Sequence, residues 1–484
     1  MQRLRSWLLQ SFAAGVAGVA GSYAVVGFTP AFVAGTIAAV LARVTPGVVV
    51  TFAITVLGDL GKLLTVVGGL ALSVALFASL ALLALAIGDA VRSSVLPPVV
   101  GGTAVFGVAT LLTGVPVAAL VAGVATGLVL VVAPLAARID TGADVSPARR
   151  EALGVVGAAL VAVGIGYPLG QQQTPSVDTG VVAAEPQAML DDATTKSLDV
   201  EGLEPLVSDA FYQVDINAAD PTIDAEAWTL SVTGAVDQEL EVTYDELTAM
   251  ASREVFNTLR CVGESLNGKK MDNALWTVVP MTDLLERAGV DDQCCVMLRA
   301  ADGFYEEFPV AALKRGLLAY RKNGRPLPRG HGSPVRALIP GHWGEINVKW
   351  LTEIEILERP ADGYWEERGW HGTGPVNTVA KLHVVNRLDG NRIQVAGHAY
   401  AGTRGVAAVQ VSIDDGETWR DARLSEALPG DDVWRQWAYE YDSPGERHEV
   451  TVRAVEADGT VQPKDETGAF PSGPSGWVTR TIQP

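Results

Sequence analysis

The stretch "LRCVGESLNGKKMDNALW", residues 259–276, contains Cys261, one of only three cysteines among the 484 residues. The residues that follow it directly, including Gly263, Glu264 and Asn267, are polar or loop-forming. Because a structural cysteine usually packs among apolar neighbours, this placement favours a functional thiol. A thiolate is a soft metal ligand and a good nucleophile, so we expect Cys261 to contact a ligand or a metal.

The other two cysteines are adjacent, at Cys294 and Cys295 in "CCVMLRA". The apolar residues beside them predict a buried strand. Three cysteines cannot form a disulfide framework, so we interpret this pair as two small core residues.

The first third of the chain has the composition of a membrane domain. Residues 1–170 carry eight basic and five acidic residues, whereas residues 171–484 carry 28 basic and 50 acidic residues. Runs of about 20 apolar residues are long enough to cross a bilayer. The sequence predicts about five transmembrane helices, at 7–28, 63–88, 98–115, 117–137 and 152–169. Arg43, Thr45 and Pro46 interrupt the stretch 31–57, which predicts two short interfacial or re-entrant pieces.

Charge gives the expected orientation of these helices. If 31–57 does not cross, the basic tips all fall on one side: Arg3, Arg5, Arg92, Arg138, Arg149 and Arg150. The positive-inside rule places that side in the cytoplasm. We therefore predict a multi-pass protein of the cell membrane whose remaining residues lie on the extracytoplasmic side. Arg149 and Arg150 also resemble an internal twin-arginine export signal, and an ordinary positive-inside anchor explains them equally well.

The rest of the chain divides by pattern. Residues 171–208 are rich in Gln, Pro, Thr and Asp and predict a linker. In 209–377, the strand patterns "AWTLSVTGAV" and "LTEIEILERP" alternate with the short amphipathic helix "PMTDLLERAGV", which predicts an α+β domain. In 378–484, regularly spaced strand patterns between turns predict an immunoglobulin-like β-sandwich.

The charge pattern contains one anomaly. The net charge is −19 and arginine outnumbers lysine 27 to 9, which suggests a halophilic source and argues against nucleic acid as a partner. Yet the window 308–344 contains no Asp or Glu. It contains nine basic or histidine residues: Lys314, Arg315, Arg321, Lys322, Arg325, Arg329, His331, Arg336 and His342. We interpret it as a site for an anionic, phosphate-bearing ligand; a solvated basic patch, or a surface that docks on anionic lipid, is the alternative.

Other known site motifs are absent from the sequence. There is no GxGxxG, Walker loop, HExxH, CxxC, CxxCH or GxSxG pattern. A cysteine protease that pairs Cys261 with His331 would leave the basic window unexplained. The cysteine and the basic window therefore need one common explanation.

From about Phe211 to the end, the chain resembles the sulfite oxidase family of molybdenum enzymes. "LRCVGESLNGKKMDNALWTVVPMTDLLERAGV" is similar to the family's cysteine loop and following helix, and "NGRPLPRGHGSPVRALIPGHWGEINVKWLTEIEI" to its pterin-holding segment. "GYWEERGW" follows as in the family, and "VAGHAYAGTRGVAAVQVSIDDGETWRDARL" resembles the C-terminal dimerisation domain. The apolar first part resembles that of membrane-bound prokaryotic relatives.

The resemblance implies a molybdenum-molybdopterin cofactor. Cys261 would be the catalytic residue and the protein's thiolate ligand on the metal. His331, Arg336 and Lys349 match positions that bind the pterin and its terminal phosphate. Asn217 and Asp302 match further members of that pocket. No haem domain is recognised, so we expect a separate electron carrier or respiratory component, and a homodimer through the C-terminal domain.

The sequence departs from the family where sulfite oxidation places arginines. Gln213 follows the aromatic pair Phe211-Tyr212, and Glu264 and Ser265 replace part of the family's C-x-G-N-R-R pattern. A carboxylate at Glu264 beside the metal would repel a dianion. We therefore predict oxygen-atom transfer on a small sulfur- or nitrogen-containing substrate, with a neutral or cationic substrate preferred over sulfite. In the alternative, Glu264 points into solvent and other arginines, such as Arg260 or Arg368, replace the missing ones. The alternatives are a reductase of S- or N-oxides and a non-enzymatic surface protein that binds a partner.

Overall fold

The computed structural model describes residues 2–138, 147–173, 182–291 and 293–483. They form two compact units. The helical unit comprises Met1–Thr45, Gly58–Val177 and Asp215–Thr222, and the β-rich unit comprises Pro46–Leu57, Asp178–Val214 and Ile223–Pro484.

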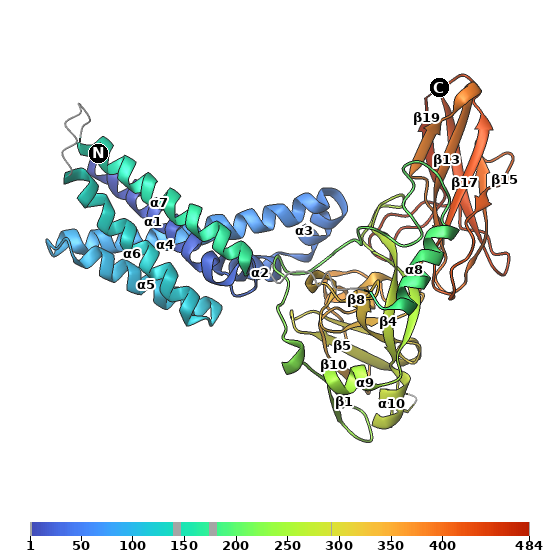
Figure 1. Cartoon of the computed structure of the whole chain (residues 1–484), viewed down its shortest axis with the longest axis horizontal. Coiled ribbons are helices and arrows are strands. Elements are labelled where there is room, and N and C mark those ends of the chain that lie inside the picture. Colours follow the sequence, from blue (N-terminus) through green and yellow to red (C-terminus); the bar gives the residue numbers. More distant parts are fainter. Residues whose placement is uncertain (1, 139–146, 174–181, 292, 484) are drawn as a thin grey trace. The chain divides into compact units, whose positions relative to one another are not determined.

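The helical unit is built from long apolar helices (Figure 1). They are α1 (Gln2–Val26), α2 (Val33–Val44), α4 (Asp59–Ala90), α5 (Leu96–Thr113), α6 (Pro116–Arg138) and α7 (Pro147–Gln172). Helix α1 contacts α4, α6 and α7, and α5 packs on α6. Small residues permit this close packing: a Cβ at Gly15 would lie 2.6 Å from a backbone oxygen of α4, and one at Gly21 would lie 2.9 Å from one of α6.

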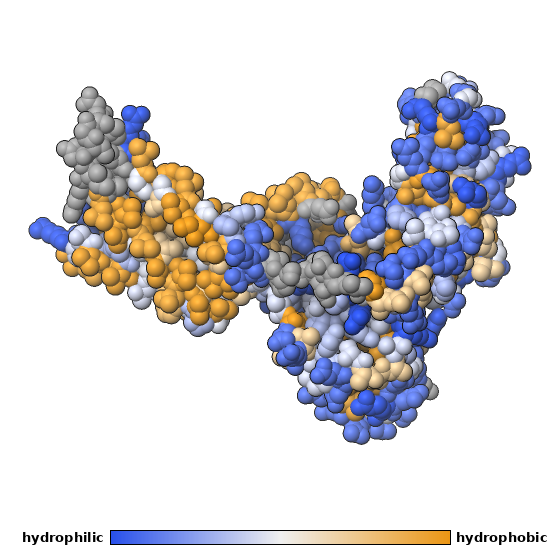
Figure 2. All heavy atoms as spheres, in the orientation of Figure 1, coloured by the Kyte–Doolittle hydropathy of each residue, from blue (hydrophilic) through white to orange (hydrophobic). Residues whose placement is uncertain are grey.

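Four of these helices are long and apolar enough to cross a membrane, as far as the described residues go: Arg3–Val26, Leu60–Ala90, Leu96–Thr113 and Ala152–Gln172. Their outward surface is strongly apolar, as the orange surface in Figure 2 shows. These helices suggest a membrane domain. The fifth predicted span, 117–137, corresponds to α6, which offers the shorter apolar helix Pro116–Val132, so the count of five remains a prediction.

The stretch 31–57 is broken at Pro46, as predicted, and folds as short helices; its interfacial or re-entrant placement stays a prediction. Helix α2 ends at Val44, and α3 (Gly47–Phe52) continues into the π-helix η1 (Ala53–Leu57). Proline disfavours a helical conformation in the residue before it, so Pro46 explains why the chain breaks at Thr45. Pro46–Leu57 is part of the β-rich unit, although the rest of the stretch is not.

The first part of the β-rich unit is the predicted α+β domain, with two five-stranded sheets. The first, in the order β2-β1-β10-β5-β6, comprises Leu240–Thr243, Thr229–Gly234, Leu351–Leu357, Cys295–Ala300 and Tyr305–Pro309. The second, β3-β4-β7-β8 with β9 beside β7, comprises Arg253–Arg260, Met271–Pro280, Leu317–Lys322, Arg325–Pro326 and Arg336–Leu338. Strand β1 is parallel to β10, and the other pairings are antiparallel.

Short helices and 3-10 turns precede, connect or follow these strands. They are α8 (Ala184–Lys196), α9 (Tyr244–Ala249), α10 (Thr282–Ala288) and α11 (Val310–Leu313), with 3-10 turns η2 (Ala225–Ala227), η3 (Arg329–His331), η4 (Gly344–Ile346) and η5 (Glu366–Arg368). Helix α9 begins with a capping box between Thr243 and Glu246. The amphipathic pattern around 280–290 correctly predicted α10, which ends at Gly289 in the left-handed region.

The C-terminal part is the predicted β-sandwich of two antiparallel sheets. The first contains β11 (Val379–Ala380), β12 (Val384–Arg387), β13 (Arg392–Tyr400), β16 (Arg423–Leu424) and β17 (Arg435–Asp442). The second contains β14 (Val406–Ser412), β15 (Arg420–Asp421), β18 (His448–Glu456) and β19 (Val478–Ile482). The 3-10 turn η6 (Asp389–Asn391) precedes β13. Alternating residues of both sheets, such as Val395, Val411, Trp437 and Val452, fill a common core.

Two predictions need comment. Within the predicted linker 171–208, residues 174–181 lie outside the described residues, but α8 is helical and Leu206 is fully buried. The linker is therefore packed at its C-terminal end. The interpretation of Cys294 and Cys295 as two core residues is wrong in part: Cys295 is buried in β5, whereas Cys294 is exposed and forms a disulfide with Cys295.

Candidate functional site

Cys261 lies on the loop that joins β3 to β4. These strands pair along their whole length, and the Cys261 N–H donates to the Lys270 carbonyl at 2.9 Å, which closes the loop at its base. The thiol is free. Burial, and then the charge of Glu264, raise the pKa of Cys261 to about 11. A metal ion at this position would displace the thiol proton, because a coordinating thiol is deprotonated.

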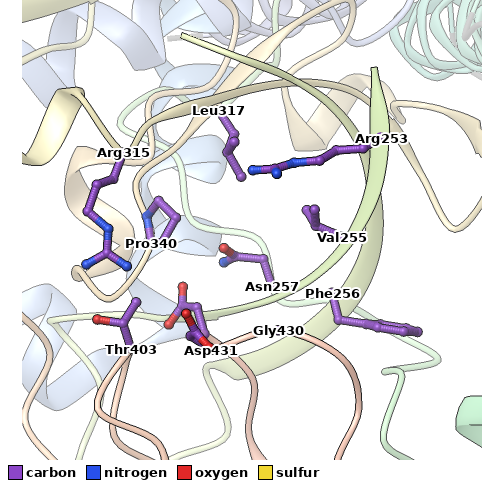
Figure 3. A pocket seen from close by; sticks show the side chains of 11 residues that line it. Arg253, Val255, Phe256, Asn257, Arg315, Leu317, Pro340, Thr403, Gly430 and Asp431 are labelled. Atoms are coloured by element: carbon purple, nitrogen blue, oxygen red, sulfur yellow. The ribbon is translucent and has the colours of Figure 1, made fainter. Parts of the chain in front are cut away.

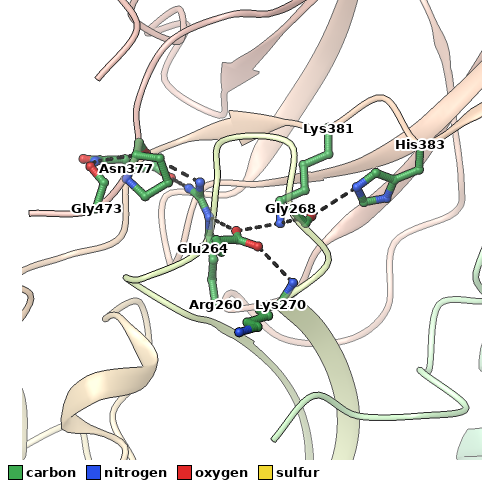
Figure 4. Close-up of polar contacts among 9 residues, drawn as sticks. Arg260, Glu264, Gly268, Lys270, Asn377, Lys381, His383 and Gly473 are labelled. Atoms are coloured by element: carbon green, nitrogen blue, oxygen red, sulfur yellow. Dashed lines mark hydrogen bonds and ion pairs between the residues drawn. The ribbon is translucent and has the colours of Figure 1, made fainter. Parts of the chain in front are cut away.

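Glu264 fixes the cysteine loop from inside the protein (Figure 4). Its carboxylate accepts from Arg260 Nε at 2.8 Å, Lys381 Nζ at 2.6 Å and the Lys270 N–H at 2.9 Å. Arg260 and Lys381 are both fully buried. Burial by itself raises the pKa of Glu264, but Lys381 and then Arg260 lower the pKa below its ordinary value. The three charges therefore stabilise one another.

The same network ties the cysteine loop to the β-sandwich. Lys381 lies between β11 and β12, and its Nζ also donates to the Gly268 carbonyl at 2.9 Å. Arg260 Nη1 donates to the Asn377 carbonyl at 2.7 Å. The C-terminal domain therefore holds the loop that carries Cys261.

This network corrects one sequence-based expectation. The preference against sulfite assumed that Glu264 faces a substrate beside the metal. The carboxylate is instead buried and paired with Arg260 and Lys381. The same pairing means that Arg260 does not replace a missing substrate-binding arginine.

The basic window and the segment that follows it bring three predicted cofactor-binding residues together. Arg336 is buried at the start of β9, and its guanidinium donates to the carbonyls of His331 at 3.3 Å and Asn347 at 2.9 Å. Lys349 Nζ donates to the Gly330 carbonyl at 3.0 Å. The loop 329–332 and the segment 347–350 are thus held together around His331, Arg336 and Lys349.

An aromatic cluster supports this basic group. Phe211 packs edge-on against His331 and Trp276, with ring centroids 5.5 Å apart in each pair. Lys322 lies over the Phe211 ring and Arg336 over the Trp276 ring, at 4.9 and 5.4 Å from the centroids. Such contacts orient cations without neutralising them. Sequence reasoning counted Lys322 among the window's cations but did not assign it a place in the site.

Tyr212 connects the basic group to the cysteine. Its N–H donates to Asp272 on β4 at 2.5 Å. The side chain is partly buried. Desolvation, followed by the proximity of Cys261, raises the pKa of Tyr212 well above its ordinary value, whereas Arg336 lowers it. Cys261 and Arg336 therefore both act electrostatically on one side chain.

The other two predicted residues lie on other segments of the chain. Asp302 lies in the turn between β5 and β6 and accepts from the Phe304 N–H at 2.9 Å. Asn217 belongs to Asp215–Thr222, which is part of the helical unit. Both remain predicted members of the pocket.

An apolar segment covers the cysteine loop. Thr51 of α3 accepts a hydrogen bond from Trp370 Nε1 at 3.2 Å. Ile54 of η1 lies so close to Gly263 that a Cβ there would be 2.7 Å from its Cγ2. The segment Pro46–Leu57 therefore packs against Gly263, two residues after Cys261. The sequence did not predict this contact.

A separate cavity of about 430 Å³ lies where the α+β domain meets the β-sandwich (Figure 3). Arg253 and Asn257 of β3, Arg315, and Thr403 and Asp431 of the sandwich are among the residues that line it. None of the predicted site residues lines this cavity. It is distinct from the basic group around Arg336.

Comparisons with known proteins agree with this geometry. The oxidoreductase molybdopterin binding domain matches residues 217–365, and the Mo-co oxidoreductase dimerisation domain matches residues 375–471. The fold and the site therefore define a molybdopterin-binding oxidoreductase.

Individual relatives refine that class. Mouse mitochondrial sulfite oxidase is 28% identical over 297 residues, which is 50% of this chain and 54% of that protein. The uncharacterized oxidoreductase YuiH of Bacillus subtilis (strain 168) is 32% identical over 154 residues, 31% of this chain and 76% of that protein. Volvox carteri NADH nitrate reductase is 28% identical over 294 residues, 48% of this chain and 34% of that protein. This chain belongs to the sulfite oxidase family of molybdopterin-dependent oxidoreductases, and it spans about half the length of the sulfite oxidases it matches.

The residues present fit the cofactor that the family implies. Burial and the nearby charge of Arg336 lower the pKa of Lys322 to about 8. An anionic group bound between these cations would relieve that repulsion, as the terminal phosphate of a pterin would. The soft donor at Cys261 suits molybdenum.

Proposed function

We propose that this protein is a membrane-anchored molybdenum-molybdopterin oxidoreductase that transfers an oxygen atom on a small sulfur- or nitrogen-containing substrate outside the cytoplasmic membrane. One observation supports this most: a single structural unit combines the free thiol of Cys261 with the basic group of His331, Arg336 and Lys349. The membrane-spanning candidates support the anchor. The extracytoplasmic side rests on the positive-inside rule.

Each residue has a distinct part in this proposal. Cys261 would hold the metal, and His331, Arg336 and Lys349 would bind the pterin and its phosphate. When bound, the cofactor supplies oxygen-atom transfer coupled to a two-electron change at the metal. Glu264, Arg260 and Lys381 hold the Cys261 loop in place. A separate carrier or respiratory component would exchange the electrons.

The pairing of Glu264 bears on the substrate. A dianion such as sulfite needs several cationic donors, but Arg260 and Lys381 are already bound to Glu264. Gln213 stands where sulfite-oxidising relatives often place an arginine. We therefore prefer a neutral or cationic substrate, and a reductase of S- or N-oxides is the second candidate.

The test uses the full chain, purified in detergent from a host that makes the cofactor. We expect one molybdenum and one pterin per chain, and faster turnover of a sulfoxide or N-oxide than of sulfite with artificial electron carriers. Absence of molybdenum would overturn the cofactor proposal. A specificity constant for sulfite near 10⁶ M⁻¹s⁻¹, about the middle of the efficient range, would overturn the substrate preference.

The match to a dimerisation domain at 375–471 also supports a homodimer. Sedimentation of the detergent-solubilised full chain would then give twice the mass of one protein chain. A single chain per particle at micromolar concentration would contradict this proposal.

A further inference from the structure

Three glutamates from separate elements converge in the β-rich unit. Glu306 lies on β6, Glu345 on η4 and Glu366 on η5. Each offers a carboxylate oxygen, and these three oxygens all lie within 4.8 Å of one another. Glu306 is fully buried and Glu345 is 8% exposed. We call this group the glutamate triad.

The triad lacks the partners that buried carboxylates need. Glu306 accepts backbone N–H groups from Glu307 and Trp365, each at 3.3 Å. All four carboxylate oxygens of Glu345 and Glu366 are buried without a hydrogen-bond partner. Among the described residues, none of the three carboxylates forms an ion pair. A buried carboxylate that is neither paired nor hydrogen-bonded is strongly disfavoured, so a missing ligand is indicated.

Two glycines, Gly363 and Gly372, leave space for the carboxylate oxygens of the triad. A Cβ at Gly363 would lie 1.4 Å from Glu306 Oε1, and one at Gly372 would lie 1.8 Å from Glu345 Oε2. No other residue type fits at either position without displacing a carboxylate. The two glycines thus leave room for the carboxylates on two sides.

Arg368, which lies on η5 with Glu366, is otherwise engaged. The Arg368 guanidinium stacks on Tyr364 at 3.6 Å and donates to the Tyr364 carbonyl at 2.5 Å. Its ion pair is with Glu367, at 3.7 Å, and not with the triad. Arg368 therefore does not neutralise the three carboxylates.

We propose that Glu306, Glu345 and Glu366 bind one divalent cation of the oxygen-preferring class, such as Ca²⁺, Mn²⁺ or Mg²⁺. Three carboxylates offer six hard oxygen donors and no sulfur or nitrogen, the ligand set that these ions select. The triad offers a different donor set from Cys261, whose soft sulfur suits molybdenum, although the charge of Glu345 is near enough to raise the pKa of the Cys261 thiol. This inference does not depend on the proposed substrate or reaction.

The alternative is that the triad shares protons and carries no metal. Burial and mutual repulsion favour protonation, and they raise the pKa of Glu345 to about 8. A shared proton can join Glu306 to Glu366, because a hydrogen bond between these two carboxyls raises the pKa of Glu306. It leaves both buried oxygens of Glu345 without a partner. A single cation satisfies all three side chains at once.

The experiment uses the full chain in detergent, stripped of divalent ions with a chelator that leaves molybdenum in place. Mn²⁺ is added as a probe, and bound and free ion are measured by equilibrium dialysis and electron paramagnetic resonance. We expect one Mn²⁺ per chain. Glu345→Gln and Glu366→Gln should each weaken binding at least about tenfold, because ligand charge sets affinity. The control Glu367→Gln, next in the chain but exposed and outside the triad, should bind as the wild type does.

A second measurement needs no variant. Mn²⁺ or Ca²⁺ should raise the unfolding temperature of the wild type in a saturable way, because a ligand that binds only the folded state stabilises it. Absence of saturable binding and of thermal stabilisation up to millimolar ion would overturn the proposal. So would Mn²⁺ binding that Glu345→Gln and Glu366→Gln leave unchanged. Molybdenum content, measured in parallel, separates this result from the fate of the cofactor.

Discussion

At the scale of single residues, the protein treats two buried glutamates in opposite ways. Glu264 has two buried cations and a backbone N–H as partners, whereas Glu345 has none among the described residues. The first carboxylate is therefore ionised and holds the structure together. The second requires either a proton or a ligand.

The Glu264 network predicts a large loss of stability when its acid is removed. Glu264→Gln leaves Arg260 and Lys381 buried without a counter-ion, which should lower the free energy of unfolding by about 3–5 kcal/mol. Denaturant unfolding measures this change. Glu426→Gln, at an exposed glutamate, is the control and should change stability by less than about 0.5 kcal/mol. An equally small effect of Glu264→Gln would show that the network does not stabilise the fold.

We predict that substitution of Cys261 reduces activity while the fold is retained. Cys261→Ser replaces a soft thiolate by a harder hydroxyl, so we expect turnover to fall at least about a hundredfold while the pterin is retained. Ser265→Ala, at an exposed position of the same loop, should keep its activity. Steady-state assays and pterin fluorescence measure the two quantities. Wild-type turnover in Cys261→Ser would remove Cys261 from the metal site.

Glu345 predicts a pH dependence of stability. Its pKa is about 8 in the folded protein, against an ordinary value of 4.5, so the folded state binds the proton more tightly than the unfolded state. In ion-free protein, its contribution is fully present below about pH 4.5 and is lost as the pH rises through 8. Unfolding free energies measured across this range should show a fall on the order of a few kcal/mol, which Glu345→Gln reduces. Saturating Mn²⁺ should suppress the fall, because it stabilises the ionised form.

At the scale of elements, the loop 329–336 depends on one glycine. Gly332 has φ +103°, and a Cβ there would lie 3.0 Å from the Cβ atoms of both Arg336 and Lys349. This close approach brings two predicted pterin-binding side chains together. Only glycine adopts this conformation and leaves that space.

Gly332→Ala should therefore impair both stability and cofactor retention. We expect a loss of about 1–3 kcal/mol from backbone strain, with added crowding. Gly445→Ala is the matched control, because Gly445 has φ +78° and a Cβ there would have no heavy atom within 4 Å. This variant should lose stability through backbone strain alone and should retain the pterin. Thermal unfolding and pterin content per chain test this. Equal pterin content in both variants would contradict the role of Gly332.

Local sequence patterns predicted the helices and strands better than they predicted the functional sites. The alternating pattern at 351–357 predicted β10, and the 3.6-residue period near 282–288 predicted α10, because each buries one face. The role of Glu264 could not be read from the sequence, because its partner Lys381 is 117 residues away. The glutamate triad was missed for the same reason, since Glu306, Glu345 and Glu366 meet only through tertiary packing.

At the scale of the whole molecule, the chain joins an apolar helical unit to an acidic β-rich one. The resemblance at the sequence level identified the family, the cofactor and the order of domains, because cofactor-binding loops are local and rich in recognisable residues. Membrane topology depends on charges at helix ends instead. The membrane topology is therefore predicted from the positive-inside rule and needs a direct test.

The topology test uses a reporter that is active only outside the cytoplasm. Fused after Gly170, it should be active; fused after Arg92, at a predicted cytoplasmic tip, it should be inactive. The ratio of the two activities, normalised to expression, measures orientation. The opposite ratio would place the β-rich unit in the cytoplasm.

The segment Pro46–Leu57 has a practical consequence for anyone who cuts this protein in two. It belongs to the β-rich unit and packs against Gly263 and Trp370, yet it precedes most helices of the helical unit in the sequence. Because this segment is part of the same chain, its effective concentration at the surface beside Cys261 is high. A fragment that begins after α7 would lose this segment and expose apolar surface beside Cys261. Such a fragment should therefore be supplied with residues 46–57 as a separate peptide or an engineered fusion.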